Sequence, residues 1–356
     1  MKRVYVGLSG GVDSSVSAAL LKEQGYSVVG VYMKNWTQDV GGVACPWAED
    51  LRDARAAAAV LDIPFKVFDF QTEYKQLVVD VMVAEYAAGR TPNPDVLCNQ
   101  DIKFNLFLKT ALADGADMIA TGHYAQTRNG VLQMAIDSDK DQTYFLYRIT
   151  REALEHTFFP VGEFTKPKVR ELAANFNLPT ATKPDSQGIC FVGEVGMKAF
   201  LSEYVATIPG PVVHAGVQIG THEGAIFYTI GQRHGLGIGG GKPYFVVGKD
   251  MITNTVYVTD NASDLALVGQ DFALSDLSWV GDALSSTAAQ EVSVRLRHRG
   301  RLIPARLEHS AGTWTVHLQT PERAIAPGQS AVIYADGVCL GGGIIELPQH
   351  ATSLVQ

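Results

Sequence analysis

The sequence has few cysteines, and their spacing excludes several classes of protein. Four occur in 356 residues, namely Cys45, Cys98, Cys190 and Cys339. None of them forms a Cys-x-x-Cys pair, the usual local pattern of a zinc site, an iron–sulfur site or a redox couple. Cysteines this far apart also argue against a disulfide scaffold, so we expect a chain that folds in a reducing compartment around apolar cores.

The sequence also lacks a long apolar run. No segment approaches the roughly 20 residues that a membrane helix requires. Met1-Lys2-Arg3 leads directly into the apolar residues Val4 to Leu8, a pattern typical of a core strand and not of a signal peptide. We therefore expect a cytoplasmic protein with no membrane partner.

Lysine and arginine are outnumbered by aspartate and glutamate, and the net charge at pH 7 is −8. A chain of this charge is not expected to coat nucleic acid nonspecifically, because it would repel phosphates as a whole. One local basic segment is present, in which a dozen residues without Asp or Glu contain Arg295, Arg297, Arg299, Arg301 and Arg306. If the segment is a strand, its alternate residues share one face, and the first four arginines would suit a sugar-phosphate backbone.

Apolar periodicity predicts an α/β domain at the start of the chain. Four short apolar runs have the length of buried strands, at residues 4–8, 28–33, 65–70 and 118–121. Apolar residues recur at helical spacing over residues 14–24, 48–61, 72–88 and 99–113. Strands that alternate with helices form a parallel sheet covered on both faces, so we expect a doubly wound α/β domain. A further helix that starts near Thr165 extends this domain to about Cys190.

Two β-rich domains are expected to follow. After Gly210 the chain has short β-rich runs separated by glycines, and from about Phe272 to Leu347 polar and apolar residues alternate. This alternation predicts a compact β-barrel. The predicted boundaries are 1–195 for the α/β domain, 196–270 for a small central β-rich domain, 271–348 for the barrel and 349–356 for a tail.

A glycine-rich loop carries the first chemical signal. Ser9-Gly10-Gly11-Val12-Asp13-Ser14-Ser15 follows the first strand and opens the first helix, so backbone N–H groups and the positive helix end converge there. Paired glycines let a phosphate approach closely, whereas Asp13 would repel it unless a divalent ion lies between them. The loop has neither the Walker nor the Gly-x-Gly-x-x-Gly pattern. It resembles the PP-loop of ATP pyrophosphatases, which adenylate a carbonyl oxygen and release pyrophosphate.

Seven further motifs occur in order along nearly the whole chain. They are residues 30–36 (GVYMKNW), 89–99 (GRTPNPDVLCN), 120–125 (ATGHYA), 140–146 (KDQTYFL), 185–191 (DSQGICF), 228–233 (YTIGQR) and 340–343 (LGGG). With the loop, they resemble the motif series of the tRNA-specific 2-thiouridylases. The resemblance implies an enzyme that uses ATP with Mg²⁺ to adenylate the C2 oxygen of the wobble uridine in tRNAs for lysine, glutamate and glutamine. Sulfur then replaces that oxygen, which gives 2-thiouridine, AMP and pyrophosphate.

The resemblance also implies roles for two cysteines. Cys190 is expected to carry a persulfide supplied by a sulfur-donor protein. Cys98 is expected to be the catalytic nucleophile that helps to release the sulfur and can form a disulfide with Cys190. In the sequence itself, Cys98 lies just before a helix expected to start near Asn99, where the helix dipole would lower a thiol pKa.

Other residues match the ligand contacts of the family. The expected ATP contacts are Gly7, Leu8, Ser9, Gly10, Gly11, Val12, Asp13, Ser14, Met33 and Gly122, with Asp13 also counted as catalytic. Asn93, Pro94 and Asp95 match the segment that meets the target base, where Asp95 could accept a hydrogen bond from the imide N–H of uracil. The expected tRNA contacts are His123, Lys140, Asp141, Gln142, Arg299, Gly300 and Gln329.

One segment departs from the family pattern. The family commonly has Arg-Tyr-Arg-Gln where this chain has Arg297-His298-Arg299-Gly300, so an aromatic ring and an amide are missing. This puts a stacking or hydrogen-bonding contact with tRNA in doubt, although Arg301 could add a phosphate contact.

Two other functions fit part of the sequence. A PP-loop enzyme with a small-molecule acceptor, such as an amidating synthetase, would share the loop but would have no use for both Cys98 and Cys190. A noncatalytic RNA-binding protein could retain the loop as a relic, although the loop, the cysteines and the base-contact segment are all intact. Cys45 and Cys339 lie in no matching motif and are expected to be inert.

Overall fold

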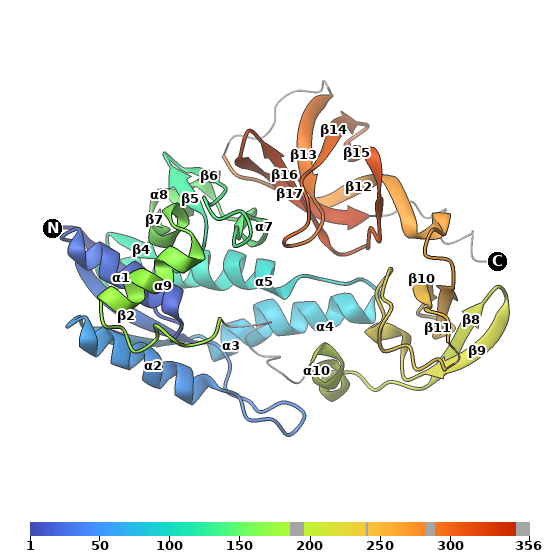
Figure 1. The fold of residues 1–356 in the computed structure, drawn as a ribbon, viewed down its shortest axis with the longest axis horizontal. Helices are drawn as coiled ribbons and strands as arrows, with labels where there is room; N and C mark the ends of the chain where they lie inside the picture. Colours follow the sequence, from blue (N-terminus) through green and yellow to red (C-terminus); the bar gives the residue numbers. More distant parts are fainter. Residues whose placement is uncertain (186–195, 240, 282–288, 347–356) are drawn as a thin grey trace.

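The computed structural model describes residues 1–185, 196–239, 241–281 and 289–346. It contains an α/β domain, a small central sheet and a β-barrel, in that order along the chain (Figure 1). The fold class predicted from the sequence is confirmed. Cys190 and the rest of segment 186–195 lie outside the described residues.

The α/β domain is built on a parallel sheet in the order β3-β2-β1-β4-β7. Its strands are β1 (Arg3–Gly7), β2 (Ser27–Lys34), β3 (Phe65–Asp69), β4 (Met118–Ala120) and β7 (Thr157–Phe158). The strand order changes direction between β1 and β4, so the connections that leave these two strands diverge. A crevice at the carboxyl ends of β1 and β4 is therefore the expected ligand site of such a sheet.

Helices cover both faces of this sheet (Figure 1). Successive residues of β1 face opposite sides, so Val4 and Val6 join one apolar core while Tyr5 joins the other. The α-helices are α1 (Val12–Glu23), α2 (Trp47–Val60), α3 (Gln71–Tyr74), α4 (Asp80–Ala87), α5 (Pro94–Leu97), α6 (Phe107–Ala113), α7 (Thr143–Leu146), α8 (Arg151–Glu155), α9 (Lys166–Asn175) and α10 (Met197–Tyr204). Among the described residues, no helix is long and apolar enough to cross a membrane.

Two π-helical segments join neighbouring helices into longer rods. Lys75–Val79 connects α3 to α4, and Cys98–Leu106 connects α5 to α6. Short 3-10 turns lie at Pro160–Glu163, Ala225–Phe227 and Leu265–Leu267. The helical stretches expected over residues 72–88 and 99–113 therefore exist, and the second begins five residues earlier, at Pro94.

The central domain is a four-stranded sheet in the order β10-β11-β8-β9. Its strands are β8 (Gly210–His214), β9 (Val217–His222), β10 (Phe245–Asp250) and β11 (Thr255–Thr259). Val212, Val246 and Val256 are fully buried and form its small core. The helix α10, which the sequence reasoning missed, precedes this sheet.

The last domain is a closed six-stranded barrel. Its strands are β12 (Val268–Trp279), β13 (Gln290–Arg295), β14 (Ile303–Ser310), β15 (Thr313–Arg323), β16 (Ser330–Ala335) and β17 (Val338–Glu346). They pair in the order β12-β15-β14-β13-β16-β17, and β12 also pairs with β17, which closes the barrel. The alternating pattern predicted this barrel because apolar side chains fill its interior.

A hairpin of the α/β domain extends the barrel sheet. The strands β5 (Gln126–Arg128) and β6 (Val131–Gln133) form the hairpin, and β6 pairs with β17 at Gln133 and Val338. No sequence pattern predicted this contact, because it joins segments about two hundred residues apart. This pairing joins the barrel to the domain that carries the phosphate loop, which is the glycine-rich loop at residues 9–15.

Candidate active site

The glycine-rich loop lies at the crevice between β1 and β4. Gly10 has a φ of 78°, a left-handed conformation that glycine adopts without strain. The hydroxyls of Ser14 and Ser15 donate to the carbonyl oxygen of Gly11 at 3.1 and 2.9 Å. Gly11 is the N-cap of α1 and has no side chain to occupy the N–H groups of the first turn. These N–H groups can therefore bind an anion.

Three other predicted ATP positions surround this loop. A Cβ atom on Gly122, just after β4, would lie 2.5 Å from the backbone nitrogen of Ser14 and 2.8 Å from the carbonyl carbon of Asp13. A Cβ atom on Gly7 would lie 2.9 Å from Cε of Met33. The fold thus brings together residues from the carboxyl ends of β1, β2 and β4, as the ATP prediction requires.

Replacing Gly122 with alanine is expected to weaken ATP binding at least tenfold. The new methyl group would collide with the backbone of the first turn of α1, which cannot move without displacing the loop, at an expected cost to stability of about 1–3 kcal/mol. Calorimetric titration with ATP measures the affinity. The matched control is Gly239→Ala, where a Cβ atom would meet nothing within 4 Å. Equal ATP affinities in the two variants would contradict the close packing of Gly122 against the loop.

In the structure Asp13 forms an ion pair with Lys166, a contact that the sequence did not reveal. Nζ of Lys166, at the start of α9, lies 2.7 and 2.8 Å from the two carboxylate oxygens of Asp13. The hydroxyl of Tyr124 donates to Asp13 at 2.8 Å, and burial together with this carboxylate raises the pKa of Tyr124. The repulsion expected between Asp13 and a phosphate is therefore offset by Lys166 in this state. Only the helix start was visible at Thr165-Lys166-Pro167 in the sequence.

Lys166 also reaches Asp185, the last described residue before segment 186–195. Asp185 accepts from Lys140 at 2.8 Å and from Arg170 at 2.6 Å, and its distance to Lys166 is 2.9 Å. Burial opposes ionisation of Asp185, but the hydrogen bonds from Lys140 and Lys166 prevail and lower the pKa of its carboxyl group. Three cations thus contact the carboxylate of Asp185.

Cys98 does not lie at a helix start, which corrects the sequence-based expectation. The helix begins at Pro94, and the N-cap Asn93 accepts a hydrogen bond from the backbone N–H of Asp95 at 3.2 Å. Proline is well tolerated at the first helical position, so the helix starts at Pro94 and not near Asn99 as expected. Cys98 therefore lies in the second turn, where the helix dipole acts weakly, and its exposed fraction is 3%.

Lys103, a residue that the sequence reasoning missed, contacts His123 and acts on Asp95 through its charge. Nζ of Lys103 lies 3.4 Å from Nε2 of His123, and Nδ1 of His123 lies 2.8 Å from the hydroxyl of Thr121. An ammonium group can only donate, so Nε2 is the acceptor and the proton resides on Nδ1. Burial, and then the charge of Lys103, hold the pKa of His123 well below its usual value.

Burial has the opposite effect on Asp95. It raises the pKa of the Asp95 carboxyl group, and the charge of Lys103 opposes the rise. Asp95 and Cys98 are three residues apart on one helix and so lie on the same side of it. The predicted base-contact residue and the predicted nucleophile therefore share a face.

The Lys140-Asp141-Gln142 motif makes contacts within the protein. Asp141 is 1% exposed and forms a 2.6 Å ion pair with Arg295 of the barrel. It also accepts from the hydroxyl of Thr143 at 2.7 Å. A direct tRNA contact is thus not available to the Asp141 side chain in this structure. Gln142 accepts from the backbone N–H of Tyr124 at 2.9 Å, which ties the motif to the phosphate-loop region.

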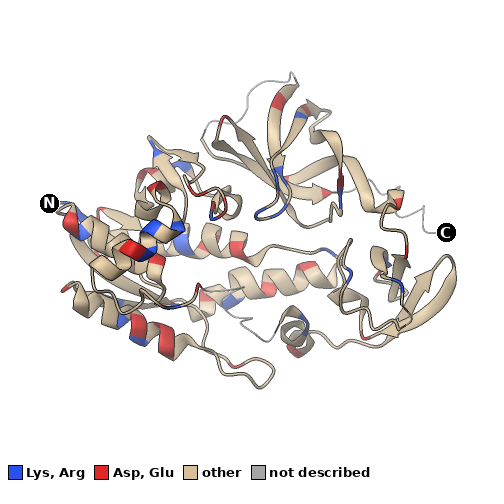
Figure 2. Ribbon diagram, viewed as in Figure 1, with Lys and Arg blue, Asp and Glu red and all other residues tan. Residues whose placement is uncertain are grey.

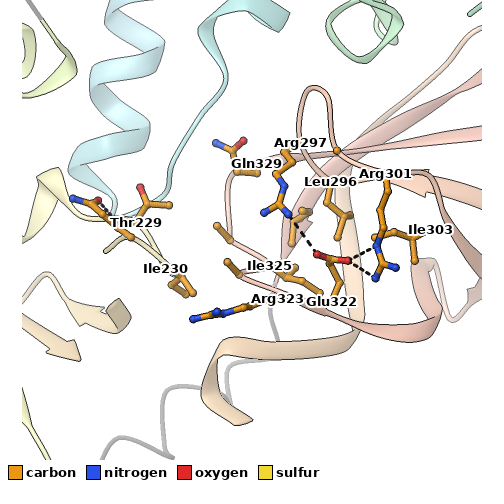
Figure 3. A pocket seen from close by; sticks show the side chains of 16 residues that line it. Thr229, Ile230, Leu296, Arg297, Arg301, Ile303, Glu322, Arg323, Ile325 and Gln329 are labelled. Atoms are coloured by element: carbon orange, nitrogen blue, oxygen red, sulfur yellow. Dashed lines mark hydrogen bonds and ion pairs between the residues drawn. The ribbon is translucent and has the colours of Figure 1, made fainter. Parts of the chain in front are cut away.

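The arginine segment is not a single strand, which corrects a second expectation. β13 ends at Arg295, which is 5% exposed, and residues 297–301 form a turn in which Arg299 has a φ of 58°. Arg297 and Arg301 both approach the carboxylate of Glu322, at 3.6 and 2.8 Å (Figure 3). Basic residues lie on the edge of the barrel nearest the α/β domain (Figure 2). The basic surface is therefore a turn, with Arg295 excluded from it.

His298 stands where the motif series that this chain resembles commonly has an aromatic residue. Its ring packs on that of Phe145, with centroids 4.5 Å apart, and burial lowers the pKa of His298. The position thus keeps a ring contact, made with Phe145 of the motif at residues 140–146.

A cavity of about 300 Å³ separates the central domain from the barrel (Figure 3). Gly300 and Gln329, two of the predicted tRNA contacts, line it together with Arg297, Arg301 and Glu322. Nε2 of Gln329 donates to the carbonyl oxygen of Thr91 at 2.7 Å, just before the predicted base-contact segment. Gln329 therefore joins the lining of the cavity to the chain just before that segment. No group of three or more His, Cys, Asp or Glu side chains that could hold a metal ion is present in the described parts of the chain.

Comparison with known proteins covers all three domains. Family models match as a tRNA methyl transferase HUP domain over residues 2–194, a tRNA methyl transferase PRC-barrel domain over 198–260 and an aminomethyltransferase beta-barrel domain over 269–345. The chain is 48% identical to a protein of Nitrosomonas eutropha named "tRNA-specific 2-thiouridylase MnmA", over 96% of this chain and 98% of that one. A protein of the same name from Lactococcus lactis is 45% identical over 99% and 97%.

A likeness to solved structures is weaker. A 4-thiouridine synthetase–RNA complex with bound ATP is 17% identical, with a TM-score of 0.36, over 54% of this chain and 45% of its own. This likeness is too slight to add to the comparison.

Proposed function

The chain belongs to the family of tRNA-specific 2-thiouridylases, and from this membership we propose that it replaces the C2 oxygen of a tRNA uridine with sulfur. The observation that carries the proposal is the identity of 45–48% to proteins of that name over nearly the full length of both chains. The site supports it, since one crevice gathers the glycine-rich loop with Gly122, and the helix that begins at Pro94 carries both Asp95 and Cys98.

ATP is the proposed activating substrate, and it enters with Mg²⁺. The N–H groups at the start of α1 and the hydroxyls of Ser9 and Ser14 suit its phosphates. Mg²⁺ is usually held by phosphates, waters and one or two carboxylates. Asp13 is the carboxylate that the loop offers, so the residues present fit a metal ion that arrives on the nucleotide.

In the activation step, the C2 oxygen of the uridine bonds to the α-phosphorus of ATP. The bond from that phosphorus to the bridging oxygen breaks, and pyrophosphate leaves with the electron pair. Asp95 accepts a hydrogen bond from the imide N–H and so orients the base. AMP, now attached to the base, is a far better leaving group than the original oxygen.

In the sulfur step, a persulfide on Cys190, delivered by a sulfur-donor protein, attacks C2, and AMP departs with the oxygen. The thiolate of Cys98 then attacks Sγ of Cys190. The sulfur–sulfur bond breaks, 2-thiouridine is released, and the two cysteines are left as a disulfide that a cellular thiol must reduce. The requirement for a reducing thiol pool and for tRNA places this reaction in the cytoplasm.

The proposed substrate is the wobble uridine of tRNAs for lysine, glutamate and glutamine. The basic turn at residues 297–301 is the proposed contact for the tRNA backbone, because Glu322 holds Arg297 and Arg301 beside the cavity while leaving their side chains 64% and 63% exposed. Gly300 and Gln329 lie at the same cavity.

The double variant Arg297→Ala, Arg301→Ala is expected to reduce the salt dependence of tRNA binding. Each lost phosphate contact lowers the slope of log affinity against log salt by roughly 0.9, so the pair should lower it by about 2. Binding titrations at several salt concentrations measure the slope. Arg306→Ala, which removes an exposed arginine paired with Glu308 elsewhere on the barrel, is the control. An unchanged slope in the double variant would remove this turn from the tRNA interface.

The proposed function is tested by mass spectrometry of nucleosides from unmodified tRNA. The tRNA is incubated with the protein, Mg-ATP and a persulfide donor, with a parallel reaction that lacks ATP. ATP-dependent 2-thiouridine is the expected product. Pyrophosphate release that ignores tRNA, with no thiolated nucleoside, would instead assign the chain to a PP-loop enzyme with a different acceptor.

A further inference from the structure

Thr91 lies where the three domains of the protein meet. It stands between α4 and the predicted base-contact segment, residues 93–95. Its backbone N–H donates to the carbonyl oxygen of Pro327 in the barrel at 3.1 Å, and its carbonyl oxygen accepts from Nε2 of Gln329 at 2.7 Å. Its hydroxyl lies 3.0 Å from the hydroxyl of Thr229 in the central domain. Every polar group of Thr91 therefore contacts another domain.

Three glycines, one from each domain, allow the chains to approach closely at this junction. A Cβ atom on Gly328 of the barrel would lie 2.7 Å from the backbone nitrogen of Thr91. A Cβ atom on Gly89 would lie 2.8 Å from a side chain of the central domain, and one on Gly231 would lie 2.3 Å from a side chain of the barrel. Packing this close transmits a displacement of one domain to its neighbours.

Thr229 belongs to the motif at residues 228–233, which lies outside the residues used in the activation and sulfur steps. The motif forms a turn in which the backbone N–H of Gln232 donates to the carbonyl oxygen of Thr229 at 3.0 Å. The backbone N–H of Thr229 donates to Oε1 of Gln232 at 3.1 Å, and Nζ of Lys249 donates to the carbonyl oxygen of Tyr228 at 2.7 Å. The turn is thus fixed on the central sheet, and it presents the hydroxyl of Thr229 to Thr91.

The chain between Thr91 and Asp95 is stiff. Pro92 and Pro94 fix their own φ angles at about −65°, and a residue before proline is confined to extended conformations. Asn93 accordingly has a φ of −114° and a ψ of 97°, and its side chain accepts from the backbone N–H of Asp95 at 3.2 Å. Because the conformation of this segment is restricted throughout, a displacement of Thr91 is carried to Asp95.

We propose that Thr91 is a positioning residue for the target uridine, and that its hydroxyl contact with Thr229 sets the base-contact segment against the central domain. The inference rests on the proposed function, in which Asp95 orients the uridine. Thr229 and Gln329 both line the cavity beside the basic turn (Figure 3), so the contacts of Thr91 lie where the tRNA backbone is proposed to bind. Thr91 acts through residues 93–95 and touches neither ATP nor the uridine.

Thr91→Val tests the proposal, since it removes the hydroxyl but keeps the shape of the side chain. A small misplacement of the base slows both steps, so kcat for 2-thiouridine formation and for tRNA-stimulated pyrophosphate release should fall together by about tenfold or more. The dissociation constants of tRNA and Mg-ATP should change by less than about twofold, because uniform binding is retained. An unchanged kcat, or a loss of tRNA affinity that accounts for the whole effect, would overturn the proposal.

Two variants control for a merely structural effect. Thr91→Ser keeps the hydroxyl and should retain at least about half of the wild-type kcat. Thr253→Val removes a hydroxyl that contacts Asp250 and Thr255 within the central domain, at 2.7 and 3.0 Å, and should leave kcat unchanged. A Thr91→Ser variant as slow as Thr91→Val would show that the hydroxyl is not the group that matters.

A double-variant cycle tests the contact with Thr229. Thr229→Val alone should lower kcat as Thr91→Val does. The variant that combines both changes should lose no more than either, because the same hydrogen bond is removed in each case. Losses that multiply would show that the two hydroxyls act separately, which would overturn the contact.

A further measurement reads the position of the base without relying on activity. Unmodified tRNA for lysine that carries 4-thiouridine at the wobble position is bound to the protein and photo-cross-linked, and the peptides are identified by mass spectrometry. We expect cross-links within residues 93–98, with a yield about fivefold lower or less in Thr91→Val at equal occupancy. Equal yields would overturn this inference alone. A wild-type protein that binds tRNA without this cross-link would refute the base-contact segment and the inference with it, and only one that also forms no 2-thiouridine would refute the proposed function.

Discussion

Cys98→Ser is expected to abolish thiolation of tRNA while leaving activation of the uridine intact. Activation uses the phosphate loop and needs no thiol, whereas release of sulfur requires a nucleophile that serine cannot replace. We expect the rate of 2-thiouridine formation to fall roughly 10³-fold or more, the scale of losing a covalent nucleophile. Both steps are measured in reactions that contain unmodified tRNA. Nucleoside mass spectrometry follows thiolation, and a pyrophosphate-release assay follows activation.

The structure indicates that this variant will fold. Cys98 is buried within a helix, and a serine hydroxyl of similar size can donate to a carbonyl oxygen in the preceding turn. Cys190→Ser should cause the same loss, since the two cysteines act in one exchange. The matched control is Cys45→Ser, because burial raises the pKa of the Cys45 thiol and keeps it protonated at neutral pH. Thiolation retained by Cys98→Ser, or lost by Cys45→Ser, would contradict the assigned roles.

Arg295→Met is expected to destabilise the protein by about 3–5 kcal/mol, the usual cost of leaving one partner of a buried ion pair uncompensated. Both side chains of the Arg295–Asp141 pair are almost completely buried, at 6% and 0% exposure. The pair joins the barrel to the motif at residues 140–146, which also donates from the hydroxyl of Tyr144 to the carbonyl oxygen of Ser330 at 3.0 Å. Urea unfolding followed by fluorescence and circular dichroism measures the change.

Two controls distinguish loss of the pair from loss of any arginine. Arg306→Met removes an exposed arginine of the same barrel, paired with Glu308, and should cost less than about 1 kcal/mol. The double variant Arg295→Met, Asp141→Leu removes both charges and should recover most of the lost stability. If Arg295→Met costs no more than Arg306→Met, the buried pair does not hold the barrel in place.

The sequence predicted the position of the glycine-rich loop between β1 and α1, because that feature is local. The loop follows β1 directly and opens α1, so seven consecutive residues determine its N–H groups, its glycine turn and its hydroxyls. The alternation that predicted the barrel is also a short-range pattern, repeated in each strand. The sequence-based predictions were wrong at the ends of two elements, where a pattern of neighbouring residues does not show where a helix starts or a strand stops. Pro94 was expected to precede the helix, and the arginines were expected to continue the strand beyond Arg295.

The residues and pairings that the sequence reasoning missed depend on contacts between distant segments. Lys166 lies 153 residues from Asp13, and Asp141 lies 154 residues from Arg295. Lys103 lies in none of the motifs, and only its position near His123 and Asp95 identifies it as part of the site. A charged residue has the same local pattern whether it is solvated or buried, so no periodicity could reveal these partners.

By itself, the sequence determined the α/β fold followed by β-rich domains, the glycine-rich loop between β1 and α1, and the family, because each depends on residue order and on spacing within a few positions. The tertiary structure alone decided which charges are buried and paired. It placed Lys166 against the loop, turned Asp141 inward toward Arg295 and set Arg297 and Arg301 around Glu322. The physical reason is that the energy of a charge depends on its distance to other charges and to water, and folding fixes both distances.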